Sequence, residues 1–277
     1  MQQSAAAGGR VTYRHVFAVR EFTALTAALV LSVVGDQFAR VAVSVLVYRR
    51  TGSPLLTAVA FGISFLPWAL GGPLLAAAAD RLPRRTVLIV CDVARAVLVA
   101  ALVLPGMPLI GLLLLLLAAE MFSPPATAAR SALVPDILTG EQYVLGTSVS
   151  TMILQLGQVV GFAVGGALVA LLQISGALLL DAATFILSAA LIAIFLRARP
   201  AADTPTEAGH VVESLGAGLR LVLGDRLLLS YVSLAWLVPL FVTGAEGIMA
   251  PYARHLGGGS TTVGLLLDCW SLLLPIR

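Results

Sequence analysis

The sequence contains no lysine and no asparagine, and all 17 of its basic residues are arginine. Without lysine, the chain lacks the residue that a P-loop places on nucleotide phosphates and the amine that Schiff-base enzymes need. It has only two cysteines, no Cys-x-x-Cys pair, and three histidines that are too scattered along the chain for a metal site. We therefore expect neither a bound metal nor another cofactor.

Charge is also scarce in this sequence. Charged residues make up 11% of the chain and apolar residues 59%, and the mean hydropathy is +1.00. Soluble domains carry roughly 25% charged residues, so this chain has too few charges to coat a surface exposed to water. The composition equally excludes a disordered or collagen-like chain. It favours a membrane-embedded bundle, so the predicted fold class is an all-α, polytopic membrane protein.

The apolar residues are gathered in long stretches. A bilayer core about 30 Å thick takes roughly 20 apolar residues of helix. Seven stretches approach or exceed this length, and an eighth run is shorter and ends with the chain. They cover residues 22–48, 54–79, 86–104, 108–129, 147–172, 176–196 and 227–250, followed by 261–276. Pro124 and Pro125 predict a break or kink in the fourth stretch.

The arginines predict how these spans are oriented. With a cytoplasmic N-terminus, eleven arginines fall on the inner side and three, Arg49, Arg50 and Arg254, on the outer side. Inner loops of membrane proteins carry the excess of positive charge, so we expect residues 1–21 to lie in the cytoplasm of a bacterium and the spans to cross its inner membrane. The first span is too long for the core of a signal peptide. Because the arginines are dispersed over several loops, nucleic acid is not an expected partner.

The connections predict the domain organisation. Two outer connections are only a few residues long, which makes neighbouring helices antiparallel hairpins. The longest polar stretch, residues 197–226, contains two prolines and several acidic residues. We interpret it as a cytoplasmic linker between a six-helix transmembrane bundle over residues 22–196 and the incomplete start of a second bundle over residues 227–277.

Several ionisable residues lie inside the predicted spans, where they are costly and usually face a partner or a wet cavity. Asp36 and Arg40 are four residues apart on one helical face, as a self-neutralising pair or as part of a substrate or proton path. Asp92 and Arg95 lie near a helix end, where a structural role is favoured. Glu120 has no local partner in the sequence, so it is a candidate proton carrier, or part of the helix packing.

A family resemblance rests first on the loop after the second span. The segment Asp80-Arg81-Leu82-Pro83-Arg84-Arg85 resembles the signature loop of the major facilitator superfamily, Asp-Arg-x-Gly-Arg-Arg, with proline in place of the glycine. The resemblance implies that Asp80, Arg81, Arg84 and Arg85 act as a gate that latches two bundles on the cytoplasmic side. An acidic residue beside three arginines is also an ordinary inner membrane flank.

The fifth span carries a second resemblance. Its glycines, Gly157, Gly161, Gly165 and Gly166, are similar to the antiporter motif of the same superfamily, although Phe162 stands where the motif has proline. Residues without side chains let helix backbones approach closely, so the glycines also fit an ordinary packing face. Other phrases, such as Gly35-Asp36 and the segment from Ser123 to Asp136, resemble the exporter branch that includes siderophore and macrolide efflux proteins.

These resemblances imply a secondary active transporter, a proton-coupled exporter of small amphipathic organic molecules that acts as an antiporter. The superfamily has about twelve spans, so we expect this chain to be truncated after the seventh helix, frameshifted or partial. The alternative is an inactive or accessory fragment, which a second copy of the chain would complete as a homodimer. A membrane enzyme is disfavoured, because no Gly-x-Ser-x-Gly motif and no histidine lies within a span.

Overall fold

The computed structural model describes residues 12–67, 82–199, 220–221 and 224–273, and within these ranges the regular structure is entirely helical. The predicted all-α fold class is therefore confirmed. The helices are α1 (Tyr13–Phe17), α2 (Arg20–Thr51), α3 (Pro54–Ile63), α6 (Arg84–Ala101), α7 (Leu109–Glu120), α8 (Ser123–Ile137), α9 (Glu141–Phe195), α11 (Arg226–Gly247), α12 (Met249–His255) and α13 (Ser260–Leu273).

Among the residues that the structure describes, three helical segments are long and apolar enough to cross a membrane: Arg20–Thr51, Leu109–Ile137 and Glu141–Phe195. The last is two helices joined at a kink, because Gln173 has the non-helical angles φ 62° and ψ 177°. This kink falls in the short connection expected between the fifth and sixth spans. The helix of the fifth span begins at Glu141, six residues before the start that the hydropathy of the sequence indicated. Residues 68–79 of the second expected span lie outside the described residues.

Local sequence signals explain where several helices start and stop. Helix α2 ends at Gly52, which adopts the left-handed conformation (φ 62°), and Ser53 then caps α3 by accepting a hydrogen bond from the Leu56 amide at 3.3 Å. The expected break in the fourth span lies between Glu120 and Ser123, directly before Pro124 and Pro125. Proline fits the first turn of a helix but not its interior, so the two prolines begin α8.

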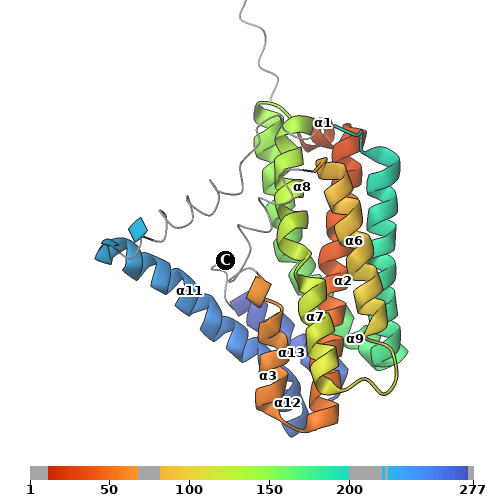
Figure 1. Ribbon diagram of the computed structural model, residues 1–277, viewed down its shortest axis with the longest axis vertical. Helices are drawn as coiled ribbons and strands as arrows, with labels where there is room; N and C mark the ends of the chain where they lie inside the picture. Colours follow the sequence, from red (N-terminus) through yellow and green to blue (C-terminus); the bar gives the residue numbers. More distant parts are fainter. Residues whose placement is uncertain (1–11, 68–81, 200–219, 222–223, 274–277) are drawn as a thin grey trace, which may run out of the picture.

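Helix α2 lies at the centre of the first part of the chain, between α6, α8 and both halves of α9 (Figure 1). Helices α1 and α8 lie at one end of the molecule, and the start of α3 with α12 at the other. Helix α11 runs obliquely towards the second end, where it contacts α3 and α12, while α13 packs against α9. The residues after position 226 therefore contact the first six spans through α3, α2 and α9.

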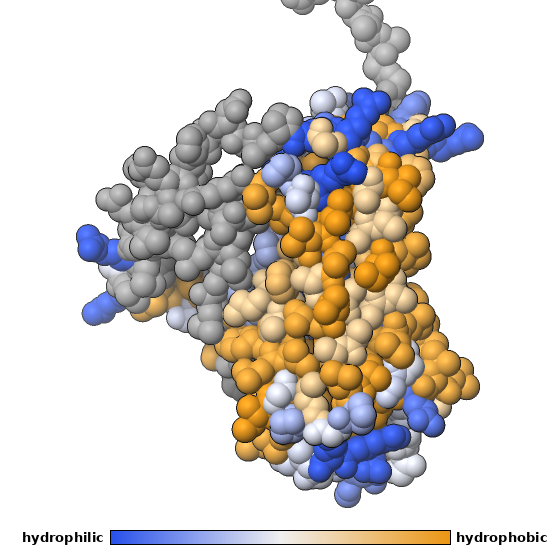
Figure 2. Space-filling model, turned by 45° about the vertical axis from the view of Figure 1, so that its right-hand side comes forward, coloured by the Kyte–Doolittle hydropathy of each residue, from blue (hydrophilic) through white to orange (hydrophobic). Residues whose placement is uncertain are grey.

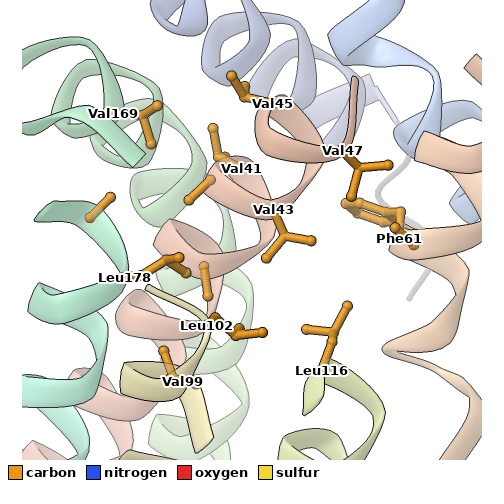
Figure 3. Packing of buried hydrophobic residues seen from close by; sticks show 14 of the residues in the cluster. Val41, Val43, Val45, Val47, Phe61, Val99, Leu102, Leu116, Val169 and Leu178 are labelled. Atoms are coloured by element: carbon orange, nitrogen blue, oxygen red, sulfur yellow. The ribbon is translucent and has the colours of Figure 1, made fainter. Parts of the chain in front are cut away.

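Two apolar clusters fill the interior, one towards each end. The first cluster, at the α3 and α12 end, contains Val41, Val43, Val47, Phe61, Leu116 and Leu178 among others (Figure 3). The second cluster, at the α1 and α8 end, includes Phe22, Leu25, Leu88, Leu133 and Ile192. The surface repeats this pattern, because an apolar band separates hydrophilic groups at the two ends (Figure 2). Such a band matches a protein whose middle lies in lipid.

The glycines of the fifth span lie at close helix crossings. A Cβ atom on Gly161 would lie 2.7 Å from Gln37 Cβ, and one on Gly157 would lie 2.8 Å from Val33 Cγ1. The absence of a side chain at both positions therefore lets α2 pack this close to α9. Gly166 faces α13 instead, where an added Cβ would lie 2.8 Å from Gly264 Cα. These glycines therefore set the distance of α9 from two neighbours, which is how small residues act between membrane helices.

Gly166→Ala is expected to lower the free energy of unfolding by about 1–3 kcal/mol, because the added methyl group meets backbone atoms of α13 that cannot move independently. Thermal unfolding of the purified protein in detergent measures this loss. Gly62→Ala is the matched control, since no heavy atom lies within 4 Å of its added Cβ and alanine is the better helix former. Equal melting temperatures for Gly166→Ala and the unchanged protein would contradict the close crossing.

Candidate functional site

Charged residues occupy the layer between the two apolar clusters. On α2, the residues of the second cluster end at Ala28, those of the first begin at Ala39, and Asp36 lies between them. On α6, Asp92 and Arg95 similarly lie between Cys91 and Ala96. Asp181 is 0% exposed, Asp92 1%, Arg95 5% and Glu120 8%. Four helices thus bring their charges to one buried depth, where each charge needs a partner.

Arg95 is the centre of this layer. Its Nη2 lies 2.5 Å from Asp36 Oδ1 and 3.9 Å from Glu120 Oε2, so it joins α6 to α2 and α7. Its guanidinium also lies over the Phe185 ring, 4.2 Å from the ring centroid, which adds a contact to the second half of α9. Two carboxylates and one aromatic face therefore compensate the buried charge of Arg95.

One of the two alternatives for Asp36 and Arg40, a self-neutralising pair, is not present in the structure. Asp36 pairs with Arg95 of α6, and Arg40 lies over the Phe65 ring at 5.2 Å from the centroid. Spacing of four residues puts two side chains on one helical face, but the closer partner across the helix interface takes the carboxylate. Among the described residues, no ion pair joins Asp36 and Arg40.

Glu120 has partners that its sequence neighbourhood did not reveal. The Ser123 hydroxyl donates a hydrogen bond of 3.0 Å to Glu120 Oε2, across the break between α7 and α8. The same oxygen is the one that faces Arg95. Glu120 is therefore held more loosely than Asp36, whose contact with Arg95 is shorter by more than 1 Å.

The sixth span contributes one face of its helix to this layer. Asp181, Thr184, Phe185 and Ser188 recur at helical spacing, and Ser188 donates a hydrogen bond of 2.6 Å to Asp92 Oδ2. Asp181 packs against Gly35, where an added Cβ would lie 2.3 Å from Asp181 Oδ1. Asp92 and Arg95 do not lie near a helix end, because α6 begins at Arg84, two to three turns earlier, and both side chains are buried inside the bundle.

A polar cavity of ≈ 380 Å³ opens beside these charges. Its lining residues come from α2, α6, α7, α8, the first half of α9 and the segment after α3. They are Leu29, Ser32, Val33, Asp36, Gln37, Arg40, Phe65, Arg95, Glu120, Ser123, Ala126, Thr127, Arg130, Leu154, Gln155 and Gln158. The three residues that the sequence nominated for a substrate or proton path, Asp36, Arg40 and Glu120, thus line one cavity.

The predicted gating loop is described only in part. Asp80 and Arg81 lie outside the described residues. Arg84 forms an ion pair with Asp136 and donates a hydrogen bond of 2.8 Å to the Ala132 carbonyl of α8, and Arg85 donates to the Ala193 carbonyl of α9. These two arginines therefore fasten the start of α6 to helices of the same bundle. Nearby, Glu21 accepts hydrogen bonds from the Arg199 side chain at 2.5 Å and the Arg197 amide at 3.0 Å.

Sequence reasoning did not single out Arg130, Ser123 or Phe185. Arg130 was counted as part of an inner flank, yet it lines the cavity because α8 continues as a helix to Ile137. The sequence signal that Arg130 belongs to a helix inside the bundle was its apolar neighbours Ala129 and Leu133, both of which are buried. Within the described ranges, no group of three histidine, cysteine, aspartate or glutamate residues is arranged to hold a metal ion.

Comparison with known proteins agrees with this arrangement. A sequence model described as Major Facilitator Superfamily matches residues 25–276. The chain is 29% identical over 223 residues to the uncharacterized MFS-type transporter YfiS of Bacillus subtilis (strain 168), covering 79% of this chain and 52% of that protein.

Solved structures show the same fold. A bacterial homologue of the human lysosomal transporter Spinster, in an inward-facing and unoccupied conformation, superposes with a TM-score of 0.68 at 18% identity, covering 93% of this chain and 60% of that chain. A POT family transporter in complex with a thioalcohol-conjugated peptide gives a TM-score of 0.52 at 16% identity, covering 77% and 47%. The chain spans about half to three fifths of the length of these relatives.

Arg95→Gln is expected to lower the free energy of unfolding by about 3–5 kcal/mol, because it leaves Asp36 and Glu120 buried without their cation. This loss is measured by unfolding in detergent. The proteins compared are the unchanged chain, the two single variants and the Asp36→Asn/Arg95→Gln double variant. The double variant should lose about 0.5–3 kcal/mol less than the two single losses together.

Arg254→Gln is the matched control for that measurement. Arg254 is exposed and lies 5.9 Å from the Tyr48 ring centroid, so its replacement is expected to change the unfolding free energy by less than about 0.5 kcal/mol. Strict additivity of Asp36→Asn and Arg95→Gln would show that their ion pair does not hold α2 to α6.

Proposed function

This chain belongs to the Major Facilitator Superfamily of membrane transporters, and we propose that it is a secondary active transporter that exports small amphipathic organic molecules in exchange for protons. The observation that carries the proposal is the cavity, because the charged groups of its lining lie between two apolar clusters and include an ion pair. Transporters of this kind bind their substrates near the middle of the membrane. The phrases shared with siderophore and macrolide efflux proteins support the direction of transport.

We propose that Glu120 binds the transported proton. It is the more loosely held of the two carboxylates on Arg95, so its protonation sacrifices the weaker contact. When Glu120 is neutral, Asp36 is the one of the two that still carries a negative charge for Arg95. The attraction that holds α7 to α2 and α6 is then weaker. Proton uptake is thereby coupled to the packing of the helices that line the cavity, as reciprocal coupling between two sites requires.

The conformational change itself is proposed to use two features that lie near opposite ends of the bundle. At one end, Arg84 and Arg85 fasten α6 to its own bundle, and we assign both, with Asp80 and Arg81 before them in the sequence, to the gating loop. Towards the other, the crossing of Gly166 and Gly264 lets α9 and α13 lie in backbone contact. A crossing without side chains permits two helices to slide or separate with little steric hindrance.

In the membrane, we propose that residues 1–21 and the linker 197–226 are cytoplasmic. Residues 22–196 then form the first transmembrane bundle of the bacterial inner membrane, and residues 227–277 begin the second. Arg84, Arg85, Arg197 and Arg199 all belong to hydrogen bonds at the end of the molecule that holds α1 and α8, which supports a single positively charged face there.

Transport is expected from the purified chain in liposomes with an acidic lumen. Ethidium, a permanent cation, and 2-naphthyl phosphate, an anion, are the two amphipathic probes, and at least one should accumulate faster than in protein-free liposomes. Glu120→Gln should reduce the gradient-dependent rate by about tenfold or more, because the amide cannot exchange a proton. Glu141→Gln, at the exposed start of α9, is the control and should retain the rate.

Accumulation of neither probe by the unchanged chain would contradict the proposed activity and leave the family membership intact. A Glu120→Gln variant that retains full gradient-dependent transport would instead remove Glu120 from the proton path.

Orientation is tested by cysteine labelling in intact bacterial cells, after the two natural cysteines, buried Cys91 and exposed Cys269, are replaced by alanine. A membrane-impermeant maleimide should label Pro105→Cys in intact cells and Leu82→Cys only after lysis. Both residues are exposed, so reactivity reports the side of the membrane. Labelling of Leu82→Cys from outside would reverse the proposed topology.

A further inference from the structure

We infer that the cavity binds the carboxylate or phosphate group of an amphipathic molecule, and that Arg40 and Arg130 hold this group. The inference rests on the proposed function, because it assigns a substrate class to the same cavity. It starts from the charges of the lining. Three arginines, Arg40, Arg95 and Arg130, face the cavity with only two carboxylates, Asp36 and Glu120. The lining therefore carries a net positive charge.

The two carboxylates are already committed to Arg95. Among the described residues, no carboxylate lies within ion-pair distance of Arg40 or Arg130. Asp92 Oδ2 accepts a hydrogen bond of 2.6 Å from Ser188, and no ion pair joins Asp92 to Arg130 in the described part of the chain. Arg40 rests on the Phe65 ring. Two guanidinium groups at the cavity are thus left with incomplete compensation, which is expensive at membrane depth.

Hydrogen-bond donors of the same two side chains also lack acceptors. Arg40 Nε and both Nε and Nη2 of Arg130 are buried and have no hydrogen-bond partner in the part of the chain that the structure describes. A buried donor without an acceptor is costly, and more so when it is charged. Carboxylate and phosphate groups present the paired oxygens that a guanidinium binds in bidentate fashion. A bound anion at the exposed faces of these two guanidinium groups would balance their charge.

The rest of the lining fits an apolar body attached to that anionic group. Leu29, Phe65 and Leu154 contribute apolar surface to the cavity. Its volume of ≈ 380 Å³ lies within the range of about 300–1,000 Å³ that holds small organic ligands. A molecule with one aromatic or branched aliphatic part and one anionic group matches both kinds of surface.

Arg130 also lies where a second, smaller cavity of ≈ 140 Å³ begins. The two cavities share Leu29, Thr127, Arg130 and Leu154, and the smaller one continues past Tyr143 and Thr147 near the start of α9. That is the end of the molecule that we propose to face the cytoplasm. An anion entering from this end meets Arg130 before it meets Arg40, so Arg130 would select for negative charge at the entrance.

Matched probes test the inference on the purified chain in phosphatidylcholine nanodiscs. We expect 2-naphthoate and 2-naphthyl phosphate to bind at least about tenfold more tightly than 2-naphthamide, which has the same ring system without the charge. Arg40→Gln and Arg130→Gln should each abolish most of this preference. Arg49→Gln, an exposed arginine on the same helix as Arg40, should leave it unchanged. Isothermal titration calorimetry measures all the affinities.

Equal binding of naphthoate and naphthamide to the unchanged protein would overturn the inference, and this comparison needs no variant to fold. Transport of ethidium without binding of either anion would leave the proposed function standing and the anion assignment wrong. The melting temperature of each variant identifies those that fail to fold.

The anionic group could come from a soluble molecule or from a lipid headgroup. Nanodiscs that contain phosphatidylglycerol distinguish these sources. If the headgroup is the ligand, native mass spectrometry should find a retained phosphatidylglycerol that is lost in Arg130→Gln, and naphthoate binding should weaken. If a soluble anion is the ligand, naphthoate should bind equally in both kinds of nanodisc. Absence of both soluble-anion binding and lipid retention would overturn the inference.

Discussion

The buried contact between Arg95 and its two carboxylates is the constraint on which the interior depends. A guanidinium in the middle of an apolar bundle is tolerated only where anions and aromatic faces surround it. Asp36, Glu120 and Phe185 meet this need from three separate helices. The charge layer therefore fixes the relative rotation of α2, α6, α7 and the second half of α9, and it holds the two apolar clusters apart. The cavity exists because the layer is polar and its side chains do not fill it.

Close helix approach is the second element of the structure. Gly157 and Gly161 bring the first half of α9 against α2, next to Val33 and Gln37, which flank Asp36 in the sequence. Gly166 likewise allows α13 to pack closely against α9. Between membrane helices there is no difference in hydrophobicity to drive association, so short contact distances and buried polar pairs must supply the attraction. The glycines of α9 and the charge layer thus both contribute to the attraction between the helices.

The proposed transport cycle follows from combining these two elements. In this proposal Glu120, the more loosely held carboxylate, takes up the proton, and the glycine crossings let helices move against one another. The cavity between them exposes arginines whose donors are not all satisfied. Each part is a local physical property of named residues, and together they connect a proton, a conformational change and an anionic group in one place.

The sequence alone determined the fold class, the positions of most helix boundaries and the break before Pro124, because hydropathy and proline act locally along the chain. It also nominated Asp36, Arg40 and Glu120, since charge inside an apolar stretch is visible without a structure. Only the tertiary structure decided which acidic residue pairs with which arginine. Spacing suggested Arg40 for Asp36, whereas the packing of α6 supplied Arg95 from 59 residues away. Arg130 joined the cavity for the same reason: which face of a helix turns inward depends on neighbours that are distant in sequence.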